Sequence, residues 1–272
     1  MRSKYSSLSV RTAVKASVIS AAVLLSSCAT SPLGRHQLLL MPDSQMDEMG
    51  ITAYQQIKTE QSVSRDGTTN NYVNCVANAL LGALEKQGNW EVNVFVDPSA
   101  NAFALPGGKI GVNSGLLDVA QNADQLAAVI GHEIGHVQAK HGNERMSIQT
   151  ATETSMQMLQ ALSGEPSPEK QQLFGLLGLG SQVGISLPFS RKHEAEADII
   201  GLQLMAKAGF DPRESVSLWQ NMAKAGGAAQ PEFLSTHPAN STRINGLQHH
   251  MNDAMALYNN AKSSGKSPQC RR

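Results

Sequence analysis

Two histidines and a glutamate that lie close together are the residues best suited to chemistry. His132 and His136 are four residues apart in a segment with a helical pattern. Both imidazoles therefore project from one face and could share one metal ion. Glu133 stands next to the first histidine, where it could accept a proton from a water molecule on that ion. A chance HExxH sequence is expected in roughly one such chain in a hundred, so the motif needs a further ligand.

A third ligand is required because a catalytic zinc ion takes three protein ligands and keeps a fourth position for water. The best candidate is Glu194, which lies 58 residues after His136 in a segment that reads as a helix. Asp198 follows one helical turn later. The sequence thus predicts a site made from two helices that are far apart along the chain.

The segments that contain these residues resemble peptidase family M48. Residues 190–201 read SRKHEAEADIIG, which is similar to the SRxxExxADxxG motif of that family. Residues 101–116, Thr236-His237-Pro238 and Arg243 also resemble family signatures. The resemblance covers about residues 90–250 and keeps the family's order.

This resemblance implies a gluzincin fold with one zinc ion on His132, His136 and Glu194. Glu133 would act as general base, taking the proton of the zinc-bound water and delivering it to the leaving amine. The implied fold class is α+β and mostly helical, with a small sheet or hairpin and the HExxH sequence on its active-site helix.

Three auxiliary residues also follow from the resemblance. Asp198 would hydrogen-bond a ligand histidine and fix its tautomer, or else form an ion pair with Arg191 or another base. His237 matches a histidine that can approach or cap the metal. Arg243 matches an arginine that lines the site, and either His237 or Arg243 would stabilise the oxyanion.

A short extended segment is expected to bind the substrate. By the same resemblance, Asn101, Ala102, Phe103 and Ala104 match an edge strand on which an extended polypeptide lies. Recognition would then use backbone hydrogen bonds and give little sequence selectivity.

Three further ionisable residues near the motifs are expected to play no part in the site. Glu196 is offset from the helical face that carries Glu194 and Asp198, so we expect a solvated charge. His141 and His193 are out of phase with the metal motif, which favours surface or structural histidines.

The elements that must position these residues can be read from the hydrophobic pattern. Residues 92–96 alternate as a strand, and residues 101–105 and 109–113 form a hairpin around Pro106-Gly107-Gly108. A helix capped by Asn122 or Asp124 is expected to run to about Lys140. Other expected helices span 44–62, 68–87, 143–162, 190–208, 212–225 and 239–260, and the apolar stretch 173–189 is expected to be a buried or surface-docked helix.

The N-terminus reads as a lipoprotein signal peptide over residues 1–27. A basic start and an apolar run precede Leu25-Ser26-Ser27-Cys28, which resembles a lipobox with Cys28 as the lipidated residue. The alternative is an ordinary secretory signal with a chance cysteine. Ala29 after the cysteine favours the outer membrane of a Gram-negative bacterium, so we expect a periplasmic, lipid-anchored protein.

The remaining chain divides into a linker at 28–43, a zinc metallopeptidase domain at 44–262 and a polar tail at 263–272. Cys75 and Cys270 lie in these parts, in what would be an oxidising compartment. A disulfide between them is one hypothesis. A buried Cys75 and a loose Cys270 are the other.

Charge excludes one class of partner. The first 27 residues hold four basic and no acidic residues, so the rest of this neutral chain has a net charge of −4 and no basic stripe for nucleic acid. The expected function is a periplasmic zinc endopeptidase that degrades misfolded or unassembled envelope proteins. The alternative is an outer-membrane protein assembly factor or chaperone with latent peptidase activity, in contact with the assembly machinery.

Overall fold

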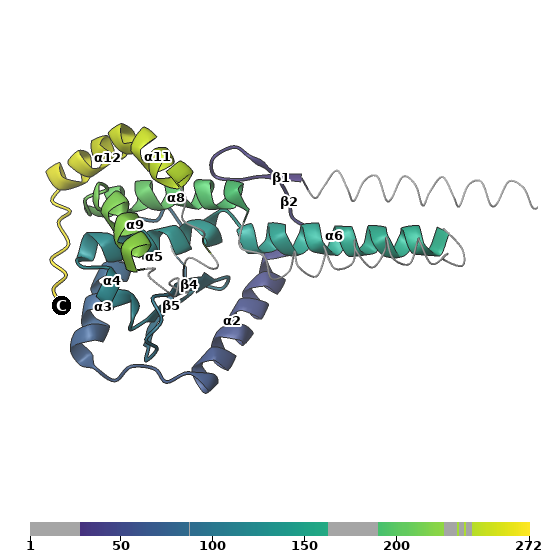
Figure 1. Cartoon of the computed structure of the whole chain (residues 1–272), viewed down its shortest axis with the longest axis horizontal. Helices are drawn as coiled ribbons and strands as arrows, with labels where there is room; N and C mark the ends of the chain where they lie inside the picture. Colours follow the sequence, from purple (N-terminus) through teal and green to yellow (C-terminus); the bar gives the residue numbers. More distant parts are fainter. Residues whose placement is uncertain (1–27, 87, 163–189, 226–232, 234–236, 238–240) are drawn as a thin grey trace, which may run out of the picture.

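The computed structural model describes residues 28–86, 88–162, 190–225, 233, 237 and 241–272. The expected signal peptide and the apolar stretch 173–189 lie outside the described residues. The described chain is mostly helical, as expected, and it contains two small sheets where one was expected (Figure 1). Within that part of the chain, no helix combines the length and apolar character that crossing a bilayer would need.

Two packed helices form the centre of the fold. Helix α5 (Ala123–Gln138) begins after Asn122, whose side chain accepts a hydrogen bond from the Gln125 backbone N–H. Helix α8 (Arg191–Ala208) begins after Ser190, which caps the His193 N–H in the same way. Such caps satisfy backbone donors that a helix start leaves free. Both helices therefore begin where the sequence signals place them.

Small residues let these two helices approach each other closely. A Cβ atom added to Gly201 of α8 would lie 2.7 Å from the backbone nitrogen of His132 on α5. One added to Gly135 of α5 would lie 2.9 Å from the carbonyl oxygen of Ala197 on α8. Any larger side chain at these positions would separate the helices, so the glycines set the distance between the two halves of the site.

The larger sheet has three strands in the order β3-β5-β4. Strands β4 (Ala102–Leu105) and β5 (Lys109–Asn113) form the expected hairpin, whose turn holds Gly107 and Gly108 at φ values of 78° and 72°. Strand β3 (Glu91–Phe95) pairs in parallel with β5. Strand β4 is consequently an edge of this sheet, next to α5 (Figure 1).

Two N-terminal helices cover the sheet. Helix α3 (Gly67–Leu81) ends six residues earlier than expected and buries an apolar face, with Tyr72, Val73, Val76 and Leu80 in the core. Helix α2 (Asp43–Glu60) buries Tyr54, whose hydroxyl donates to the Ile110 carbonyl at 2.7 Å. The sheet is thereby fixed against the helical body.

The segment expected to be a linker contains a small antiparallel pair of strands, β1 (Cys28–Thr30) and β2 (His36–Leu38). The buried Gln37 amide donates to the Ala139 carbonyl at 2.6 Å, just after α5 ends. Helix α6 (His141–Leu162) continues from there and extends away from the body of the fold (Figure 1). Residues 28–38 are thus packed against the region that follows the metal motif.

The C-terminal region differs in two places from the sequence-based expectation. Helix α9 (Glu214–Ala225) begins two residues later than expected. The helix expected over 239–260 is two helices, α11 (Ser241–His249) and α12 (Met251–Ser263), which meet at His250. Outside the C-terminal region, a short helix α4 (Leu116–Val119) precedes α5.

The polar tail is attached to the body rather than loose. A disulfide joins Cys75 of α3 to Cys270, the pairing put forward as one hypothesis from the sequence. Beyond it, Arg272 Nη1 donates to the Leu117 carbonyl at 2.6 Å. The chain end is therefore held beside α3 and α4.

Candidate metal centre

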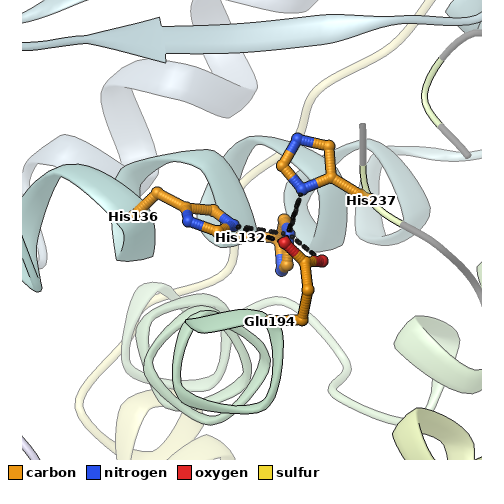
Figure 2. Close-up of side chains that lie close together, drawn as sticks. All are labelled: His132, His136, Glu194 and His237. Atoms are coloured by element: carbon orange, nitrogen blue, oxygen red, sulfur yellow. Dashed lines mark hydrogen bonds and ion pairs between the residues drawn. The ribbon is translucent and has the colours of Figure 1, made fainter. Parts of the chain in front are cut away.

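Four buried side chains from three parts of the chain converge on one point. His132 and His136 lie on successive turns of α5, Glu194 lies in the first turn of α8, and His237 approaches from the other side (Figure 2). One nitrogen or oxygen atom of each lies within 4.8 Å of all the others. The structure therefore brings together the three predicted ligands and the histidine expected to approach them.

The distances within this cluster are short. His132 Nε2 and His136 Nε2 are 3.1 Å apart, and His136 Nε2 lies 3.3 Å from Glu194 Oε1. His237 Nδ1 lies 3.0 Å from Glu194 Oε1 and 3.2 Å from His132 Nε2. All four residues are at most 4% exposed. The facing atoms are the nitrogen and oxygen donors that zinc and similar divalent ions accept.

The hydrogen bonds of His132 show that this donor set fits a cation. His132 Nδ1 lies 3.0 Å from Asp198 Oδ1, and since a carboxylate only accepts, the proton of neutral His132 is on Nδ1. Its Nε2 then turns a lone pair toward His136 Nε2. Glu194 Oε1, the carboxylate oxygen nearest to His136 Nε2 at 3.3 Å, is a further negative atom that points into the cluster. A positive ion between these atoms would satisfy all of them.

The carboxylates around the cluster favour positive charge. Burial lowers the pKa of His132, but hydrogen bonds to Asp198 and Glu194 outweigh burial and raise this pKa to about 9. Burial raises the pKa of Glu194, and hydrogen bonds from His132, His136 and His237 outweigh it and hold this pKa well below its usual range. The same carboxylates that stabilise a proton on His132 would stabilise a metal ion in its place.

Glu133 is placed for proton transfer. It lies on α5 beside the ligands, is 3% exposed, and accepts a hydrogen bond from the backbone of Ala104 on β4. Its Oε1 atom lies 3.4 Å from His237 Nε2. Burial raises its pKa above the ordinary value, against the lowering effect of His237 and His132. A buried carboxylate with a raised pKa next to a metal site is suited to accept and return a proton.

Asp198 and Arg243 form a buried pair behind the ligands. Arg243 donates from Nε to Asp198 Oδ2 at 2.7 Å and from Nη2 to Asp198 Oδ1 at 2.6 Å. Its Nη1 atom lies 2.7 Å from Glu194 Oε2, and its guanidinium stacks on Trp219 at 3.8 Å. Asp198 therefore contacts both a ligand histidine and a base, which is Arg243 and not Arg191. The guanidinium of Arg243 is turned toward these two carboxylates.

The expected substrate segment lies along the site. Ala102, Phe103 and Ala104 belong to edge strand β4, and Asn101 precedes it. The Phe103 ring packs on Phe95 at 5.9 Å and over Gly111, so this side chain supports the sheet. A cavity of about 430 Å³ lies between α2, β4 and the start of α6, and it reaches His136. Its apolar lining includes Met46, Met49, Ala53, Leu105 and Met146.

The expectation that Glu196 is a solvated charge was wrong. Glu196 is 5% exposed and accepts hydrogen bonds from Ser31 Oγ and from Arg35 Nε, the latter at 2.8 Å. Its Oε2 atom also lies 3.1 Å from His141 Nε2. Hydrogen bonds from Ser31, His141 and Arg35 outweigh burial and keep the pKa of Glu196 below its ordinary value. The helical offset was correct, but the N-terminal segment covers that face of α8.

His141 and His193 are buried and lie next to the site. The two rings stack at 4.4 Å, and His141 Nδ1 lies 3.0 Å from His136 Nδ1. Burial lowers the pKa of His141 to about 4, so its ring is neutral near pH 7. Helical phase did not reveal this contact, because Lys140 has φ of 54° and the chain turns there between α5 and α6. The sequence signal for this contact is the presence of a histidine, His141, five residues after His136.

Comparison with known proteins agrees with this geometry. A model of peptidase family M48 matches residues 65–251. The mitochondrial metalloendopeptidase OMA1 of Saccharomyces cerevisiae is 36% identical over 197 residues, which cover 70% of this chain and 54% of the relative. The beta-barrel assembly-enhancing protease of Yersinia pestis is 29% identical over 211 residues, which cover 75% of this chain and 43% of the relative.

Metalloprotease LoiP of Escherichia coli K12 is 27% identical over 217 residues, which cover 79% of this chain and 84% of the relative. The chain spans about half the length of the OMA1 relatives that it matches. The family model covers well over half of the chain, and the matched residues include His132, His136, Glu194 and His237. The chain therefore belongs to peptidase family M48.

Proposed function

We propose that this protein is a zinc-dependent metalloendopeptidase of the bacterial envelope that degrades misfolded or unassembled envelope proteins. One observation carries the proposal: Glu133 is buried directly beside the converging donors of His132, His136 and Glu194. A structural metal site has no need of a buried acid next to its ligands, whereas a zinc peptidase uses one as general base for the attacking water.

Each site residue would have its own role in this reaction. His132, His136 and Glu194 hold the zinc ion, which when bound supplies a Lewis acid and a water molecule of lowered pKa. Glu133 accepts the proton of the attacking water and returns it to the leaving amine. Asp198 would hold the His132 imidazole in the tautomer with its proton on Nδ1, so that Nε2 could bind the ion.

Edge strand β4 and the adjoining cavity would hold the substrate. An edge strand offers unpaired backbone groups, so an extended polypeptide can add to it as a further strand. The cavity beside Ala104 and Leu105 has an apolar wall that includes Met46, Met49 and Met146. Such a wall suits the apolar side chains that unfolded proteins expose.

The cellular setting rests on the N-terminus and on the relatives. Cys28 is the last residue of a lipobox-like sequence, which supports a lipid anchor in the outer membrane. One relative is named as a beta-barrel assembly-enhancing protease, and β-barrels are the proteins of bacterial outer membranes. Replacing Cys28 with Ser should abolish palmitate labelling and release the protein from the membrane fraction. Labelling that persists would contradict the anchor.

The peptidase is tested by exchanging Glu133 for Gln. This variant should bind zinc with the same stoichiometry as the unaltered protein and should fail to cleave unfolded outer-membrane proteins. Chelator should stop the unaltered protein in the same assay. Glu85→Gln is a matched control, since the Glu85 side chain is 91% exposed and far from the cluster in sequence. Full cleavage by zinc-loaded Glu133→Gln protein would exclude this role.

The position of His237 favours a second candidate, an assembly factor or chaperone with latent peptidase activity. His237 Nδ1 lies among the three ligand atoms, where it could take the coordination position that water needs. His237→Ala should then raise the rate of cleavage. An unchanged rate would argue against latency, and a lower rate would indicate that His237 assists the reaction.

A further inference from the structure

A continuous chain of hydrogen bonds connects His136 with the N-terminal segment. His136 Nδ1 lies 3.0 Å from His141 Nδ1, and His141 Nε2 lies 3.1 Å from Glu196 Oε2. Glu196 in turn accepts from Ser31 Oγ and Arg35 Nε. His136, His141 and Glu196 are each at most 5% exposed. The chain thus runs from the α5 motif through α6 and α8 to residues 31–35.

The order of donors along this chain is determined at its Glu196 end. A carboxylate only accepts, so His141 carries its proton on Nε2 and donates it to Glu196. With that proton on Nε2, the Nδ1 atom of His141 can accept a hydrogen bond from an Nδ1–H of His136, which lies 3.0 Å away. This contact supports the His136 tautomer that has its proton on Nδ1 and none on Nε2, the nitrogen on the side of Glu194 and His132. This is the tautomer that can bind a metal through Nε2.

The two ligand histidines therefore differ in their support. Nδ1 of His132 lies directly beside the carboxylate of Asp198, whereas Nδ1 of His136 lies beside the ring of His141, which in turn contacts the Glu196 carboxylate. We propose that His141 and Glu196 are positioning residues for His136, and that Ser31 and Arg35 of the N-terminal segment complete this support. The proposal rests on the metal site of the proposed function but not on peptidase activity.

The N-terminal segment is well attached at this place. Besides Glu196, Arg35 holds Glu144 with two hydrogen bonds of 2.6 Å from Nη1 and Nη2. Gln37 donates to the same Glu144 carboxylate at 2.8 Å. Residues 31–37 therefore fix Glu196 from a segment that begins three residues after Cys28, the proposed point of lipid attachment. Correct docking of this segment would support metal binding as well as stability.

Zinc affinity of the full chain tests the proposal. The dissociation constant for Zn²⁺ is measured by competition with a chromophoric chelator, which requires no cleavage. His141→Phe keeps a ring of similar shape but removes both nitrogens, and it should weaken zinc binding about 10–100-fold. His141→Gln should restore most of the affinity, because the Gln side chain has an oxygen to accept from His136 and an amide to donate to Glu196.

Two further variants separate positioning from general destabilisation. Asn143→Ala is the matched control: Asn143 is 3% exposed and its amide donates to the Met41 carbonyl at 2.8 Å, outside the chain that leads to His136. It should lower the melting temperature of the chelator-treated protein and leave zinc affinity unchanged. The double variant Ser31→Ala/Arg35→Leu should weaken zinc binding in the same direction as His141→Phe.

Unchanged zinc affinity in His141→Phe, or an equal loss of affinity in Asn143→Ala, would overturn the role of His141. Equal losses in His141→Gln and His141→Phe would also exclude a hydrogen-bonding role. Unchanged affinity in Ser31→Ala/Arg35→Leu would overturn the part that concerns the N-terminal segment. A failure of the unaltered protein to bind zinc would instead contradict the proposed function, so the two failures are distinguishable.

Discussion

Asp198 Oδ1 lies 3.0 Å from His132 Nδ1, the nitrogen of that imidazole that does not face the other ligands. The same carboxylate is held by Nε and Nη2 of Arg243. Burial alone would raise the pKa of Asp198, but the charge and hydrogen bonds of Arg243 outweigh it and lower this pKa. Asp198 thus stays ionised while buried, and it orients His132 through a charge-assisted hydrogen bond.

Replacing Asp198 with Asn should therefore weaken zinc binding. The neutral amide accepts a weaker hydrogen bond from His132 and removes the negative charge that Asp198 presents to Arg243, so we expect a loss of about 10–100-fold in zinc affinity. Competition with a chromophoric chelator measures the zinc affinity. Asp211→Asn is the control: Asp211 is another carboxylate that pairs with an arginine, Arg213, and its replacement should leave zinc affinity unchanged. Tight binding by Asp198→Asn would show that the site does not depend on this carboxylate.

The contact between α5 and α8 should be sensitive to one methyl group. Gly201→Ala places a Cβ atom 2.7 Å from the His132 backbone nitrogen, which is too short, so the helices must shift apart. We expect the free energy of unfolding to fall by about 1–3 kcal/mol and zinc affinity to fall with it. Gly246→Ala on α11 is the control, since a Cβ there meets nothing within 4 Å. Urea denaturation compares the two, and equal stability would contradict the packing argument.

Local sequence signals predicted the parts of the site that depend on one element. The spacing of His132 and His136, the Asn122 cap and the glycine turn of the β4–β5 hairpin all act within a few residues. These patterns follow from helix and turn geometry alone.

Contacts between distant segments could not be predicted in this way. The burial of Glu196 depends on Ser31 and Arg35, which are more than 160 residues away in the sequence. The approach of His141 to His136 depends on the turn at Lys140 and the start of a new helix. The position of a residue on a helical face indicates only whether its side chain points to the core or to solvent. It does not reveal a third segment that covers the polar face. Glu196 was therefore expected to be solvated, and His141 to be a surface or structural histidine.

The cavity beside β4 should affect substrate binding when it is filled. Ala53 is exposed and lines the cavity, so Ala53→Trp places a large ring where a substrate side chain would lie. We expect KM for an unfolded protein substrate to rise while zinc affinity stays constant. Gln55→Trp lies two residues further along α2, on a different face, and should leave KM unchanged. The same KM in both variants and the unaltered protein would place the substrate elsewhere.

The disulfide should stabilise the fold without acting on the site. Cys75 and Cys270 are separated by 195 residues, so their bond greatly restricts the unfolded chain. Exchanging both for Ser should lower the free energy of unfolding by about 2–5 kcal/mol and leave zinc affinity unchanged. Urea denaturation with and without reductant measures this. Reductant should destabilise only the unaltered protein, and a response of the double variant would point to another cause.

Glu144 should make docking of the N-terminal segment dependent on pH. Burial raises the pKa of Glu144, but hydrogen bonds from Arg35 and Gln37 outweigh it and lower this pKa from 4.5 to about 2. His193 Nε2 also lies 3.2 Å from this carboxylate. Because the folded pKa lies below the unfolded one, the stability contributed by Glu144 is present in full above about pH 4.5 and lost as the pH falls toward 2.

Glu144→Gln should remove this part of the pH dependence. The free energy of unfolding is measured in urea between pH 7 and pH 3, with chelator present throughout so that loss of metal does not contribute. The unaltered protein should lose more stability below pH 4.5 than the variant, because only its folded state resists protonation at this position. Glu85→Gln, which changes a side chain that is 91% exposed, should follow the unaltered protein. Parallel curves for Glu144→Gln and the unaltered protein would mean that the Arg35–Glu144 pair does not hold the segment in solution.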